Sequence, residues 1–84
     1  MLNAKQIGNY CSFNSGVLIG NKDGIDNKPI LKNYVSFGPS AKAFGNITIG
    51  ENVFIAPGAV VTKDIEDNSI AGGIPAKIIK KKNI

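Results

Sequence analysis

Apolar side chains recur at every sixth residue along most of the chain. Two such series run in parallel, the second lying four places after the first and consisting mostly of small or β-branched residues. The first series is Ile7, Phe13, Ile19, Ile25, Leu31, Phe37, Ala43, Ile49, Ile55 and Val61. The second is Cys11, Val17, Asp23, Pro29, Val35, Ala41, Ile47, Val53, Ala59 and Ile65, with Asp23 and Pro29 as its exceptions. A fixed period of this kind indicates a repeat fold.

A period of six fits short strands and excludes the commoner alternatives. A helix face repeats every ~3.6 residues, and the recurring glycines Gly8, Gly20, Gly38 and Gly50 would break it. A hairpin meander would show longer strands and Asn-Gly turns, which the sequence lacks. Because six is a multiple of the strand period of two, the first and fifth positions face the same side. The sequence therefore predicts an all-β fold, a parallel β-helix in which three repeats form one triangular coil of 18 residues.

The chain is interpreted as one domain, residues 1–84, with about three coils in residues 7–66 and a short cap with a basic tail in residues 67–84. The polar, glycine-containing stretch at residues 20–30 predicts a loop extending from one corner. So short a solenoid buries little core, and its first coil exposes unpaired strand edges. We therefore expect a homo-oligomer, with a trimer as the natural arrangement of such prisms.

Composition narrows the class of protein further. No apolar run approaches the ~20 residues of a membrane span, and no signal segment opens the chain, so a cytoplasmic location without membrane attachment is expected. The net charge of +4 is carried by ten lysines without any arginine. The cluster Lys80 to Lys82 is either a solvated tail or a patch for an anionic ligand such as a nucleotide phosphate. Nucleic acid is not expected as a partner, because arginine is missing and the aromatic residues do not interleave with the lysines.

Four segments of the chain resemble hexapeptide-repeat acyltransferases. Residues 12–20 with Lys28-Pro29, and residues 37–47, resemble serine acetyltransferases. Residues 55–65 resemble a segment shared with sugar and capsule O-acetyltransferases, and residues 73–77 match the Gly-x-Pro-Ala-Lys/Arg ending of the superfamily. The resemblance spans residues 7–79 and implies a left-handed parallel β-helix, a hand that periodicity alone does not set.

The resemblance also implies acetyl-CoA as the co-substrate, bound in a groove between neighbouring prisms along one corner of the coils. A ligand there should meet residues 18 apart, a spacing that Asn21, Pro39, Pro57 and Pro75 share. Prolines offer carbonyls and flat rings to a ligand, although they also serve simply to stiffen bends. Lys77 and Lys63 are candidates for the ribose phosphate, and Lys63 equally fits a solvated turn. The candidate cofactor-binding residues are therefore Asn21, Pro39, Ala41, Pro57, Lys63, Pro75 and Lys77.

No catalytic residue is assigned. Serine acetyltransferases use a His, oriented by an Asp, as general base, and this chain contains no His. The resemblance places that His and Asp in a coil before the segment that begins at Ile7, so a truncated or degenerate member is expected. A second family His and the Arg before it are replaced by Lys28 and Asn27. The lack of His ligands also excludes a zinc site of the β-helix carbonic anhydrase type, and no metal is expected.

Other reactive side chains are weaker candidates still. Asp23 and Asp26 lie in the polar loop, where solvated carboxylates are poor bases at neutral pH. Cys11 falls in the inward series and is expected to be a core thiol rather than a nucleophile. Ser15 has no basic partner nearby in the sequence to activate it.

Taken together, the sequence favours an acetyl-CoA-dependent O-acetyltransferase of the serine acetyltransferase type, acting on a small hydroxyl acceptor. Two alternatives stay open: a non-catalytic β-helix module for assembly or CoA binding, and a sugar or capsular polysaccharide O-acetyltransferase. The chain ends in Ile84, the residue type with which serine acetyltransferases dock onto a partner sulfhydrylase. The short tail after Lys77 argues against such docking here.

Overall fold

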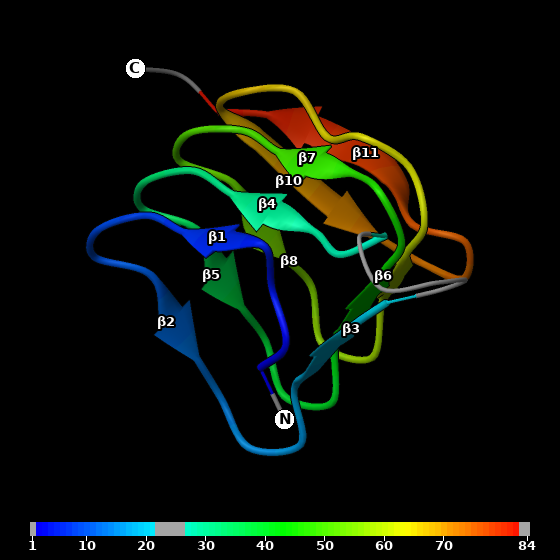
Figure 1. The fold of residues 1–84 in the computed structure, drawn as a ribbon. Coiled ribbons are helices and arrows are strands. Elements are labelled where there is room, and N and C mark those ends of the chain that lie inside the picture. The colour runs from blue at the N-terminus through cyan, green and yellow to red at the C-terminus, as the bar shows by residue number, and fades with distance from the viewer. Residues whose placement is uncertain (1, 22–26, 83–84) are drawn as a thin grey trace.

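The computed structural model describes residues 2–21 and 27–82, which wind into a stack of triangular coils (Figure 1). Each complete coil contributes one short strand to each side of a three-sided prism. The strands are β1 (Gln6–Ile7), β2 (Ser12–Phe13), β3 (Leu18–Gly20), β4 (Ile30–Leu31), β5 (Ser36–Phe37), β6 (Lys42–Phe44), β7 (Thr48–Ile49), β8 (Phe54–Ile55), β9 (Val60–Val61), β10 (Ser69–Gly72) and β11 (Lys77–Lys81).

The strands form three parallel sheets, one per side of the prism: β1-β4-β7, β2-β5-β8-β10 and β3-β6-β9. β11 is the exception, because it turns back and pairs antiparallel with β10 at the end of the second sheet. The predicted fold class, an all-β left-handed parallel β-helix of about three coils, is confirmed. Within residues 2–21 and 27–82, no helix is long and apolar enough to cross a membrane.

Both apolar series point into the prism and fill it. Ile19, Leu31, Phe37, Ile49 and Ile55 of the first series are fully buried. The second series joins them, and its members Val35, Ala41 and Val53 are also fully buried. The first coil has a neighbour on one side only, so Ile7 is 40% exposed and Cys11 is half-buried against the core. Ile25 and Asp23 lie outside the described residues.

The vertical register of the coils differs from the uniform 18-residue spacing that the period predicts. The step from one coil to the next is measured by the hydrogen bond between equivalent corner residues. These residues are 24 apart in the first step, 18 in the second and 16 in the third. The longer first step includes residues 20–30, the predicted loop, of which residues 22–26 lie outside the described residues. Because 24 is a multiple of six, the repeat stays in phase across this step. The shorter last step breaks the phase. As a result Ile65 pairs with Ile49 of the first series instead of continuing the second series, which corrects the sequence assignment.

The coils bend at three corners, which are named here by their place in each coil. Corner 1 lies between the first and second strands, corner 2 between the second and third, and corner 3 between the third strand and the next coil. Each turn at corners 1 and 2 needs one residue with left-handed backbone geometry. At corner 2 these residues are Gly16, Ser40 and Gly58, with φ of 77°, 62° and 73°.

Corner 1 is held together by a ladder of side-chain acceptors. Asn33 Oδ1 accepts the backbone N–H of Asn9 at 2.7 Å, Glu51 Oε2 that of Asn33 at 3.1 Å, and Asp67 Oδ1 that of Glu51 at 2.8 Å. Each coil therefore satisfies a corner donor of the coil before it, which would otherwise face water at the prism edge.

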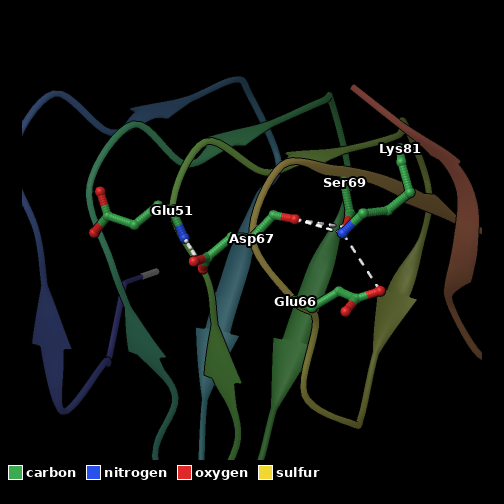
Figure 2. Close-up of polar contacts among 5 residues, drawn as sticks. All are labelled: Glu51, Glu66, Asp67, Ser69 and Lys81. Atoms are coloured by element: carbon green, nitrogen blue, oxygen red, sulfur yellow. Dashed lines mark hydrogen bonds and ion pairs between the residues drawn. The ribbon is translucent and has the colours of Figure 1, made fainter. Parts of the chain in front are cut away.

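β11 closes the C-terminal end of the prism through one lysine (Figure 2). Lys81 Nζ donates to the carbonyl oxygen of Asp67 at 2.7 Å and to Oγ of Ser69 at 3.1 Å, and it lies 3.4 Å from Oε1 of Glu66. Ser69 is fully buried, and its hydroxyl both donates to the carbonyl oxygen of Asp67 at 3.2 Å and accepts from Lys81, so this buried polar group is satisfied.

We expect Asp67→Ala to lower the free energy of unfolding by about 1 kcal/mol, because the N–H of Glu51 loses its acceptor. In a domain of this size that corresponds to a melting temperature lower by about 4–8 °C. Asp67→Asn keeps a side-chain carbonyl oxygen at the same place and is the matched control. Thermal unfolding followed by circular dichroism checks both variants, and an equal loss in the two would contradict the role given to the ladder.

Candidate functional site

The register decides which of the sequence-predicted site residues meet. Pro39 and Pro57 are neighbours at corner 2, where the N–H of Gly58 donates to the carbonyl oxygen of Pro39 at 2.9 Å. Both prolines are exposed. Above Pro39 lies Ser15, whose carbonyl oxygen accepts the N–H of Ser40 at 3.0 Å. The predicted pairing of two prolines along this corner is therefore present.

The two ends of the predicted column are wrong. Asn21 does not stack on Pro39, because the first coil is separated from the second by 24 residues. Pro75 does not stack on Pro57, because the last step is only 16 residues and brings Gly73 to the corner. The carbonyl oxygen of Gly73 accordingly accepts the N–H of Val60 at 3.0 Å.

Pro75 and Lys77 nevertheless stay next to corner 2. The chain passes through a cis Ile74-Pro75 peptide bond and returns, so that Lys77 pairs with Gly72 at the start of β11. The N–H of Ala76, between them, donates to the carbonyl oxygen of Val60 at 2.8 Å. Both Pro75 and Lys77 are exposed at the end of β9 nearest corner 2.

Asn21 and Lys63 lie at corner 3. The carbonyl oxygen of Gly20 accepts the N–H of Gly45 at 3.2 Å, so Asn21 follows directly above Gly45. β6 and β9 pair with Lys42 opposite Val60, and the same register carries Lys63 below Gly45. Both predicted residues are exposed there. The predicted site residues thus occupy the two corners that border one side of the prism.

Ala41 alone turns away from this surface. Its side chain is fully buried in the core, its N–H donates to Gly38 and its carbonyl oxygen accepts the N–H of Leu18 at 3.1 Å. A ligand outside the prism cannot reach the Ala41 methyl group.

Between corners 2 and 3 lies the outer surface of the sheet β3-β6-β9, called the β6 face from here on. Its half-buried outward residues Leu18, Phe44 and Val60 are apolar. Lys42 stands among them, and its Nζ donates to the carbonyl oxygen of Ser40 at 3.1 Å. Lys77 borders the face at corner 2 and Lys63 at corner 3. An apolar strip with lysines along and beside it suits a long ligand that combines an apolar arm with phosphate groups.

Sequence reasoning missed Lys42 and Phe44 as part of this surface. Both lie at outward positions of the repeat, next to the inward Ala43, and alternation along the strand was the signal that could have identified them.

The remaining reactive side chains form no catalytic arrangement among the described residues. Cys11 Sγ donates to the carbonyl oxygen of Lys32 at 3.2 Å and packs at the edge of the core. Ser15 is exposed at corner 2, and Lys28 is half-buried. Asp23 and Asp26 lie outside the described residues. Residues 2–21 and 27–82 hold no group of three His, Cys, Asp or Glu side chains that could hold a metal ion.

Comparison with known proteins relates this geometry to one group of enzymes, although no family model matches the chain. A serine acetyltransferase from Synechococcus elongatus is 39% identical over 80 residues, which are 93% of this chain and 33% of that enzyme. The structure of the Brucella abortus serine acetyltransferase in complex with coenzyme A superposes with a TM-score of 0.82 at 36% identity, covering 87% of this chain and 30% of that one. The Neisseria gonorrhoeae serine acetyltransferase in complex with serine gives a TM-score of 0.81 at 38% identity, covering 84% and 30%.

The chain therefore spans about a third of the length of the relatives it matches. By sequence and fold, the chain matches the C-terminal, hexapeptide-repeat part of serine acetyltransferases.

Proposed function

We propose that this chain is the coenzyme-binding part of an acetyl-CoA-dependent O-acetyltransferase, with the β6 face as the surface that holds acetyl-CoA. The observation that carries the proposal is the arrangement of this face, in which apolar side chains surround Lys42 and are bordered by exposed prolines at one corner and by a lysine at each. The coenzyme A complex of the Brucella abortus relative supports the choice of ligand.

The parts of acetyl-CoA fit the parts of the face. The pantetheine arm is long and largely apolar, and it would lie against Leu18, Phe44 and Val60. The phosphates would meet Lys42 and Lys77, which act as flexible point charges. Pro39 and Pro57 would border the arm with rigid rings and with carbonyl oxygens as acceptors.

A small hydroxyl compound such as serine is the proposed acceptor, supported by the serine complex of the Neisseria gonorrhoeae relative. The 84 residues contain no His, the side chain that titrates nearest neutral pH. We therefore propose coenzyme binding without acyl transfer for the 84-residue chain itself, which is the non-catalytic alternative raised by the sequence. The groove for the coenzyme would be completed by a neighbouring prism in a homotrimer.

Titration calorimetry with acetyl-CoA tests this proposal, together with a thiol-release assay in the presence of serine or simple sugars. We expect saturable binding and no thiol release. Lys77→Ala should weaken binding of CoA by about ten-fold, equivalent to ~1.4 kcal/mol, and should affect dephospho-CoA less if Lys77 meets the ribose phosphate. The matched control is Lys32→Ala, a lysine that is also exposed and directly follows β4.

Several results would contradict the proposal. Absence of binding would remove the β6 face as a coenzyme site, and thiol release with serine would replace the non-catalytic assignment by an active enzyme. An equal loss in Lys32→Ala would show that only the overall positive charge attracts the ligand. Light scattering on a size-exclusion column checks the proposed trimer.

A further inference from the structure

Two tyrosines occupy strained backbone positions at corner 1. Tyr10 and Tyr34 both have φ of 61°, in the left-handed region. The same place in the later coils is taken by Asn52 and Asn68, with φ of 56° and 59°. Asn adopts this geometry readily, whereas a bulky side chain there is uncommon. The first two coils therefore carry a residue type that the backbone disfavours, and strain of this kind concentrates at ligand sites.

The tyrosine rings form a flat surface that the core does not use. They stack on one another along the corner, with centroids 5.2 Å apart and an angle of 18° between their planes. Even so, 76% of Tyr10 and 55% of Tyr34 remain exposed. The loops that carry them lie one above the other at the edge of the prism (Figure 1). A ring backed by a second ring is a rigid platform on which another ring can lie.

A groove of about 530 Å³ lies on the sheet β1-β4-β7 and extends toward corner 1. Asn33, the neighbour of Tyr34 in the chain, is one of its lining residues. The other polar residues of the lining are Gln6, Lys32, Thr48 and Glu51. One positive and one negative side chain balance each other, and the others are neutral hydrogen-bonding groups. Such a lining matches hydroxyl groups better than the multiple charges of a nucleotide.

We propose that the tyrosine platform and this groove form a saccharide-binding site. The apolar C–H face of a pyranose ring would lie on Tyr34 or Tyr10, and its hydroxyl groups would reach the amide and hydroxyl side chains of the groove. The site is at corner 1, the prism edge opposite the β6 face, and so is independent of the proposed coenzyme site. The ligand class is a neutral pyranose with an apolar C–H face and free hydroxyl groups.

The composition of the chain gives this site a specific probe. Tyr10 and Tyr34 are its only two tyrosines and it has no Trp, so intrinsic tyrosine fluorescence reports on this pair alone. We expect glucose, N-acetylglucosamine or maltotriose to change the emission in a saturable way. Saturation-transfer NMR should show contact between the sugar C–H groups and the protein.

Matched variants of Tyr34 distinguish a role in stacking on the sugar from a role in stabilising the fold. Tyr34→Phe keeps the ring and should retain binding, whereas Tyr34→Asn should weaken it by about ten-fold or more, the scale of one lost stacking contact. Because Asn already occupies this place in the later coils, Tyr34→Asn should keep or raise the melting temperature. Affinity for acetyl-CoA should be the same in both variants and in the unmodified protein.

Three results would overturn the proposal. One is no saturable response to any of the three sugars at concentrations well above millimolar. Another is a lower melting temperature of Tyr34→Asn, which would make the stacked pair a structural contact. The third is a tyrosine signal that changes with protein concentration alone, which would assign the platform to contact between copies of this chain.

Discussion

Phe37→Ala should remove about 3–5 kcal/mol from the free energy of unfolding, the largest effect expected of any single substitution in this chain. Phe37 is fully buried in β5, and its ring stacks on that of Phe13 with centroids 5.6 Å apart. It is the largest of the fully buried side chains and lies between the first coil and Ile55 of the third. A small domain has only about 5–15 kcal/mol in total, so this loss approaches complete unfolding.

Chemical denaturation followed by circular dichroism measures this effect, with Phe54→Ala as the control. Phe54 belongs to the neighbouring strand β8 but points outward and is half-buried, so its truncation leaves no cavity inside the prism. We expect less than half the loss for this variant. Similar losses in both variants would show that the inner column of side chains is not the main source of stability.

Gly38→Ala is expected to have the next largest effect. A Cβ atom at this position would lie 2.7 Å from the backbone nitrogen of Pro57 and 2.8 Å from its Cδ. Neither atom can move aside without displacing corner 2, where the N–H of Gly38 also donates to Ile55 at 2.8 Å. Overpacking of this kind costs about 1–3 kcal/mol and should loosen the stacking of the second coil on the third.

Gly20→Ala is the matched control for this prediction. A Cβ atom there would meet nothing closer than 3.7 Å, and the backbone of Gly20 is not in the left-handed region. This variant should be neutral or more stable by up to about 1 kcal/mol, because alanine restricts the unfolded chain. Opposite signs for the two glycines, measured by thermal unfolding, would confirm that contact between coils selects Gly38. Equal losses would point to a general requirement for flexibility.

The two tyrosines at corner 1 illustrate a general property of solenoid folds. In a solenoid the residues of one corner form a column, so each backbone requirement is repeated in every coil. Asn52 and Asn68 meet the requirement at corner 1 without strain, whereas Tyr10 and Tyr34 meet it at a cost of about 1–2 kcal/mol each. The backbone geometry of this column is the same in every coil, but the residue type changes from Tyr to Asn. We infer that a requirement other than stability selects Tyr at the first two positions.

Much of this architecture followed from the sequence. The period of six placed Ile19, Leu31 and Phe37 inside the prism, because side chains alternate along a strand and an even period keeps the series on one face. The resemblance to serine acetyltransferases was also readable from residue types alone. These features are local or repeated, so each can be recognised without knowing what stacks on what.

The vertical register was decided by the tertiary structure alone. A period reports which side chains point inward, but the number of residues in each coil depends on how far the chain travels around corner 3 before hydrogen bonds form with the coil below. That distance removed Asn21 and Pro75 from the predicted column and moved Ile65 from one inward series to the other. The β6 face, with Lys42 and Phe44 between two corners, likewise emerged only once the coils were stacked, because its members are brought together by contacts between coils.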